Sequence, residues 1–91
     1  MDINTNHRRF IYFYFNRNQP EKIREVVPAH VQYWTTADLK SYLGGPVADR
    51  SGGLISFSAL SLEEATKIIV HDPFIKENLI EQNWIKEWMP E

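Results

Sequence analysis

One histidine and one aspartate have the residue types and surroundings to move a proton near neutral pH. His30 lies on the apolar stripe of a helical stretch with Trp34 one turn further on, and Asp72 lies at a turn just after a second helical stretch. An aspartate bonded to one imidazole nitrogen fixes the tautomer and tunes the other nitrogen for proton transfer. We therefore predict a catalytic pair of His30 and Asp72 beside a small apolar pocket. The pocket residues we expect are Tyr33, Trp34 and Phe74.

Each member of this pair also has a purely structural interpretation. A single histidine on an apolar helix face is often a core residue, and Asp72 directly before Pro73 suits the N-cap of a short helix. With His30 in the core, the chain would be a non-catalytic dimer that binds a small ligand or another protein through its aromatic faces. Whether the His30 imidazole reaches an open cavity separates the two interpretations.

Other kinds of site find little support in the sequence. The three histidines, His7, His30 and His71, show no HxH or HxxxH spacing on one element, so we expect no metal. Neither Gly44-Gly45 nor Gly52-Gly53 precedes a helix as a phosphate loop does, and the serines lack a nucleophile elbow. The expected chemistry therefore uses no cofactor.

Charge and hydropathy weigh against nucleic-acid and membrane partners. The formal net charge is −2, whereas nucleic-acid affinity comes mainly from lysine and arginine. Residues 53–58 lack the basic residue and paired rings of an RNA-recognition strand. The longest apolar run, residues 10–15, is far too short to span a bilayer, and the first residues contain no apolar leader segment. A cytoplasmic location is expected.

The elements that must position the pair follow from periodicity and turn residues. Residues 54–60 alternate as a half-buried strand, and Ser61 with Glu64 forms a capping box. Pro28 interrupts the first helical pattern, where we expect a kink or a new start. We expect strands at 10–15, 41–43, 54–60 and 83–89, helices at 20–39 and 61–70, and a short helix from 73. The order βαββαβ is a ferredoxin-like α+β fold, with an antiparallel sheet and helices on one face.

Small size predicts self-association. The 91 residues make one domain, residues 1–91, with 1–8 as a flexible lead-in, and they include no cysteine. So small a core is marginally stable without disulfides or a metal. The run at 10–15 is apolar at every position, which is typical of a strand buried on both faces. A second subunit is the simplest cover for the face that the helices leave open, so we expect a homodimer.

A set of short motifs along the chain resembles one family. They are Pro28-Ala29-His30-Val31 with Trp34, Leu43-Gly44-Gly45-Pro46, Gly52-Gly53-Leu54, Ser61-Leu62-Glu63-Glu64-Ala65 and Asp72-Pro73-Phe74. In this order and spacing the chain is similar to the YCII-related (YciI-like) domains over about residues 8–90. The resemblance implies a dimeric α/β barrel joined through the sheets, with His30 and Asp72 as the site. It also implies proton-transfer chemistry of lyase or isomerase type on a small organic molecule.

Overall fold

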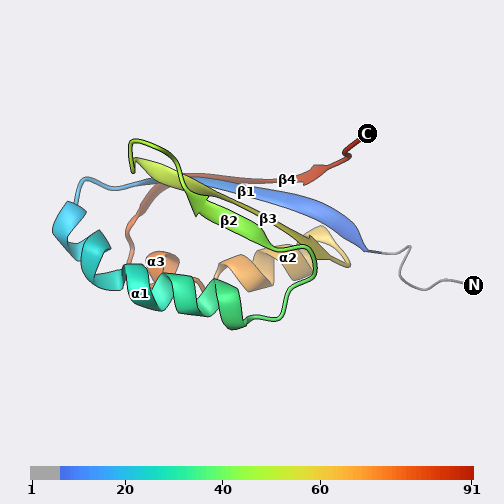
Figure 1. Cartoon of the computed structure of the whole chain (residues 1–91), viewed down its shortest axis with the longest axis horizontal. Helices are drawn as coiled ribbons and strands as arrows, with labels where there is room; N and C mark the ends of the chain where they lie inside the picture. The colour runs from blue at the N-terminus through green and yellow to red at the C-terminus, as the bar shows by residue number, and fades with distance from the viewer. Residues whose placement is uncertain (1–6) are drawn as a thin grey trace, which may run out of the picture.

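The computed structural model describes residues 7–91, and its elements follow the predicted order (Figure 1). They are β1 (Arg8–Asn16), α1 (Pro20–Thr36), β2 (Leu43–Pro46), β3 (Gly52–Ala59), α2 (Leu62–Ile69), α3 (Pro73–Lys76) and β4 (Ile80–Trp88). Residues 1–6 of the expected lead-in lie outside the described part of the chain. Arg8 already belongs to β1, so the predicted flexible lead-in of residues 1–8 is wrong at its last residue.

The four strands form one antiparallel sheet in the order β2-β3-β1-β4. All three helices lie on the same side of this sheet, and the opposite face carries none (Figure 1). This is the ferredoxin-like α+β fold that the sequence predicts. No helix among residues 7–91 has the length and apolar character needed to cross a membrane.

β1 is apolar throughout but alternates in burial. Phe10, Tyr12 and Tyr14 are buried under the helices, at 1%, 1% and 3% exposure. Phe13 and its neighbours at odd positions are only partly buried on the face without helices. The strand is therefore covered by helices on one side only within this chain.

β3 and α1 complete the core beneath the sheet. Ile55, Phe57 and Ala59 are buried, which confirms the predicted alternation of this strand. Trp34 of α1 is 1% exposed and packs against Tyr12 and Phe57. Burial of aromatic side chains is the main favourable term in so small a core.

The second strand and the hairpin loop differ from the prediction because glycine was taken as a strand end. β2 spans Leu43–Pro46 rather than 41–43, and β3 already starts at Gly52. A Cβ at Gly44 would lie 3.0 Å from Ile55 Cγ1, and one at Gly53 would collide with the Tyr14 hydroxyl. These glycines make room for side chains inside the sheet rather than ending the strands.

The helices differ from the prediction at their ends. Pro28 lies inside α1, which is assigned as one helix and ends at Thr36 rather than at 39. Asp38, two residues later, has a φ of 57°, a left-handed conformation that cannot continue the helix. β4 likewise begins at Ile80, three residues before the expected start.

α2 begins with the predicted N-cap. The Ser61 hydroxyl accepts a hydrogen bond from the Glu64 amide at 3.1 Å. The Glu64 carboxylate reaches back to the Leu60 amide, at 2.7 Å, instead of the Ser61 amide expected of a capping box. Ala65 and Ile69 form the buried face of the helix, whereas Leu62 is 52% exposed.

Candidate functional site

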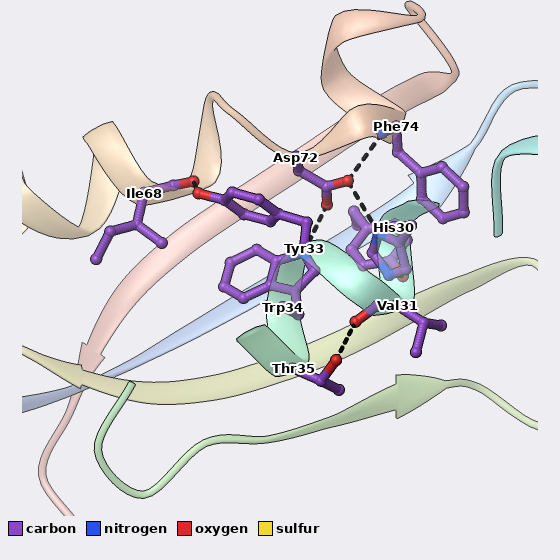
Figure 2. A network of polar contacts seen from close by, with 9 residues as sticks. His30, Val31, Tyr33, Trp34, Thr35, Ile68, Asp72 and Phe74 are labelled. Atoms are coloured by element: carbon purple, nitrogen blue, oxygen red, sulfur yellow. Dashed lines mark hydrogen bonds and ion pairs between the residues drawn. The ribbon is translucent and has the colours of Figure 1, made fainter. Parts of the chain in front are cut away.

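Asp72 lies at the junction of α2 and α3 and is completely buried. Its Oδ1 accepts the Phe74 backbone amide at 2.8 Å, which caps α3, and also lies 2.9 Å from His30 Nδ1. Its Oδ2 accepts the Trp34 indole Nε1–H at 2.9 Å (Figure 2). Asp72 therefore both caps α3 and pairs with His30, because one carboxylate makes both contacts.

The partners of Asp72 define the tautomer of His30. An amide N–H and an indole N–H can only donate, so the carboxylate oxygens act as acceptors toward them. His30 Nδ1 then carries the proton and donates a hydrogen bond to Asp72 Oδ1. In the neutral ring, Nε2 keeps its lone pair and is free to accept a proton. Asp72 thus has the geometry of a carboxylate that orients the imidazole, and His30 Nε2 has that of a base.

Aromatic packing fixes the orientation of the His30 ring. Phe74 stacks on it with ring centroids 4.0 Å apart and planes 10° apart. Tyr14 meets the rings of both His30 and Phe74 edge-on, at 6.0 Å and 6.1 Å. The His30 side chain keeps 12% exposure, so one edge of the ring still reaches open space.

Tyr14 is a site residue that the sequence analysis did not identify. Its hydroxyl lies 3.4 Å from His30 Nε2. Burial raises the pKa of Tyr14, so the phenol stays neutral at physiological pH. Tyr14 is the register partner of Gly53, which leaves space for the tyrosine ring. The sequence offered no signal for this placement, because every residue at 10–15 is apolar and only the burial pattern of β1 shows that Tyr14 faces the helices.

A cavity of about 820 Å³ opens beside the imidazole. His30, Tyr14 and Phe74 line it together, and other lining residues come from the β1–α1 connection, α1, β2, the β2–β3 loop and β3. Val27 and Val31 of α1 also line it, which explains why two residues of the apolar stripe are 39% and 48% exposed. The His30 imidazole therefore reaches an open cavity.

Tyr33 and Trp34 are not among the residues that line this cavity. Trp34 is buried and holds Asp72 through its indole, and the Tyr33 hydroxyl donates to the Ile68 carbonyl (Figure 2). Of the three pocket residues expected from the sequence, the structure brings only Phe74 to the cavity wall. Helical spacing turns Tyr33 and Trp34 toward α2 and the sheet, away from the open side of α1.

Within residues 7–91, no three histidine, aspartate or glutamate side chains gather in a way that could hold a metal ion. The His30 imidazole and the Tyr14 hydroxyl are neighbouring polar groups in the cavity lining. This arrangement can accept a proton at Nε2 and donate a hydrogen bond from the phenol, next to a largely apolar volume.

Fold and site together define a ferredoxin-like domain of the α+β barrel class, with a buried His–Asp pair at a cavity. A family model, the YCII-related domain, matches residues 8–89, so the chain belongs to the YCII-related family. No curated protein sequence matches it.

Solved structures agree with this assignment at the level of fold. A 5-chloro-2-hydroxyhydroquinone dehydrochlorinase from Burkholderia phenoliruptrix, in complex with 2,5-dihydroxybenzoquinone, is 21% identical with a TM-score of 0.79, covering 89% of this chain and 93% of that one. A protein assigned as an antibiotic biosynthesis monooxygenase from Bacteroides thetaiotaomicron is 11% identical with a TM-score of 0.67, covering 94% and 90%. A dimeric ferredoxin-like protein from Thermobifida fusca is 13% identical with a TM-score of 0.55, covering 90% and 89%.

Proposed function

We propose that this protein is an enzyme that transfers protons on a small organic molecule, by a lyase or isomerase type of reaction without a cofactor. The proposal rests on the different surroundings of the two His30 ring nitrogens. Its Nδ1 is held by the buried Asp72 carboxylate, and its Nε2 is directed toward Tyr14 at an open cavity of about 820 Å³. Structural histidines in a packed core do not need such a cavity.

The proposed reaction begins with His30 Nε2 as a general base. It removes a proton from the substrate, and the imidazolium that forms is stabilised by Asp72 across the 2.9 Å hydrogen bond. The Tyr14 phenol stays protonated and donates a hydrogen bond to an oxygen that gains negative charge. His30 then returns the proton to a second carbon, giving an isomer, or the electron pair expels a leaving group, giving elimination.

The nearest chemistry among the compared structures supports this reaction type. The dehydrochlorinase removes chloride from a hydroxylated ring, and its structure holds a dihydroxybenzoquinone. An unsaturated, oxygen-substituted ring of that size also suits the cavity of this chain, whose wall includes Phe74 and Tyr14. We therefore place hydroxylated cyclic compounds first among the substrates to test.

The proposal includes a homodimer formed through the sheet face that carries no helix. Phe13, Phe15 and Trp84 cluster on this face, with ring centroids 5.0 to 6.1 Å apart. A groove lined by Ile11, Phe13, Val47, Leu54, Trp84 and Lys86 runs beside them. Exposed apolar clusters of this kind are typical of interaction surfaces. The Thermobifida fusca relative with this fold is a dimer.

The test is a substrate screen with matched histidine variants. Chlorinated hydroxyhydroquinones are incubated with the protein, and turnover is followed by ultraviolet absorbance and chloride release. His30→Ala should lower turnover by about 10²–10⁴-fold, the usual contribution of a positioned acid–base group. His71→Ala removes an exposed imidazole and should leave turnover unchanged.

Two results would speak against the proposal. Turnover that survives His30→Ala would remove the histidine from the reaction. Binding of these compounds in the cavity without any turnover by the wild-type protein would favour the non-catalytic, ligand-binding dimer. Circular dichroism of both variants establishes that loss of turnover does not follow from loss of the fold.

A further inference from the structure

We infer that the cavity selects an anionic substrate, whose charged group is bound by Arg24 and Arg50 while its planar apolar body extends toward His30. This inference rests on the proposed function of the same cavity and names its substrate class. It starts from the charge of the cavity wall. The twenty lining residues include three arginines, Arg17, Arg24 and Arg50, and no aspartate or glutamate.

This charge balance is opposite to that of the whole chain. The chain has twelve acidic and ten basic residues, with a formal net charge of −2. A wall with three guanidinium groups and no carboxylate is therefore a local concentration of positive charge. Low-dielectric walls strengthen such a field and raise the local concentration of anions.

The three arginines are not equally available. The Arg17 guanidinium is occupied, since it contacts Glu81 Oε1 and the Asn78 carbonyl, each at 3.1 Å. Arg24 and Arg50 have no side-chain hydrogen bond and no ion pair with any residue between 7 and 91. Two of the arginines that line the cavity therefore have no carboxylate partner among residues 7–91.

The backbone of Arg50 has an uncommon conformation and is held by two hydrogen bonds. Its φ is 65°, a left-handed conformation that residues other than glycine, asparagine and aspartate seldom adopt. Its N–H donates to the Val47 carbonyl at 2.9 Å, and its carbonyl accepts from Asn16 Nδ2 at 3.4 Å. The adjacent Asp49 carboxylate accepts the amide and hydroxyl of Ser51 and does not line the cavity. A strained conformation kept for a cationic residue at a cavity is consistent with a role there.

The region between the arginines and the histidine is apolar. Val27 and Val31 lie on the cavity side of α1, and Ile55 and Tyr42 lie across from them on the sheet side. Arg24 and His30 are six residues apart on one helix, which is about 9 Å along its axis at 1.5 Å per residue. A molecule with one or two fused rings and an anionic substituent spans such a distance. Guanidinium binds carboxylate-like groups through two parallel hydrogen bonds, which favours a planar anion over a neutral one.

The test compares two probes of the same shape and different charge. 2-Naphthoate and its neutral isostere 2-naphthamide are titrated into the full-length protein by isothermal titration calorimetry. The wild type should bind naphthoate about tenfold or more tightly than naphthamide, as expected for charge-assisted hydrogen bonds. The double variant Arg24→Ala with Arg50→Asn should lose this preference while its naphthamide affinity stays unchanged.

These substitutions are chosen to preserve the fold. Alanine favours the helical conformation at position 24, and asparagine tolerates the left-handed conformation at position 50. Lys22→Ala is the matched control, because it removes one positive charge from the same helix at a residue that does not line the cavity. The control should keep the tenfold preference. Raising the salt concentration should reduce the preference in the wild type.

Three outcomes would overturn the inference: equal binding of the two probes, an unchanged preference in the double variant, or no naphthoate binding at millimolar concentration. Failure here is distinguishable from failure of the proposed function. His30→Ala should retain the preference for naphthoate, because the anion is bound by the arginines and not by the imidazole. If the enzyme acts on neutral substrates instead, turnover would still depend on His30, but the wild type would show no preference for naphthoate over naphthamide.

Discussion

At the residue scale, Asp72 combines three hydrogen bonds in one buried carboxylate. It accepts from the Phe74 amide, the Trp34 indole and His30 Nδ1, so it caps a helix, fixes a core tryptophan and orients the imidazole. Loss of the carboxylate would leave these buried donors unpaired, which is more costly than the hydrogen bonds themselves. The site and the core are therefore coupled through this one side chain.

Asp72→Asn should destabilise the protein and lower its activity. Asparagine has a single carbonyl oxygen, so its amide N–H₂ must face either the Trp34 indole or the two donors on the other side. We expect a loss of about 1–3 kcal/mol in the free energy of unfolding, measured by urea denaturation. Turnover should fall by about a hundredfold or more, because the imidazolium loses its counter-charge.

Asp38→Asn is the control for this substitution. Asp38 is exposed and has a φ of 57°, which asparagine also tolerates, so the variant should match the wild type. An Asp72→Asn protein that is as stable and active as the wild type would show that the carboxylate charge has no role.

At the element scale, α2 and α3 place Asp72, and the start of α2 is set by its cap. Ser61→Ala removes the acceptor of the Glu64 amide and should cost about 1 kcal/mol in the free energy of unfolding. Ser61→Asp keeps a side-chain acceptor at the same position and should retain most of that stability. Thermal and urea denaturation of both variants check this. Equal losses in the two would mean that the hydroxyl is needed for a reason other than capping.

At the scale of the whole molecule, the buried tyrosines predict lower stability in alkaline solution. Burial raises the pKa of Tyr12 and Tyr14 above the ordinary value of 10.0. Below about pH 10 both residues are neutral in the folded and unfolded states, so their contribution to stability is complete. Above that pH the unfolded chain ionises first, and stability falls as the pH rises toward the folded-state pKa.

The free energy of unfolding should therefore be lower at pH 11 than at pH 9. Each tyrosine contributes at most about 1.4 kcal/mol per pH unit in this range. Tyr12→Phe removes one of the two groups and should show a shallower dependence, measured by urea denaturation at each pH. An identical pH dependence in this variant would contradict the role assigned to burial.

The second prediction for the whole molecule concerns the homodimer. Phe13→Asp places a charge in the aromatic cluster on the face without helices, and it should convert a dimer into a monomer in sedimentation experiments at micromolar concentration. Leu62→Asp introduces the same charge at an apolar residue that is 52% exposed on α2, and this variant should stay dimeric. A wild-type protein that sediments as a monomer would rule out the proposed assembly.

The sequence by itself determined the order of elements, the buried face of β3 and the capping role of Asp72. These follow from local signals, namely the alternation of residues 54–60, the Ser61 cap, and Asp72 before Pro73 at the start of α3. Such signals depend on residues close in the chain, and the family pattern added the match between the two distant motifs.

Only the tertiary structure decided which residues surround the pair. Tyr14 comes from β1 and reaches His30 because Gly53 on the neighbouring strand leaves room for its ring. Trp34 does not line the cavity, and its buried indole N–H donates to the Asp72 carboxylate thirty-eight positions away. Both results depend on contacts between residues at least sixteen positions apart, and helical or strand periodicity within one segment carries no information about such contacts.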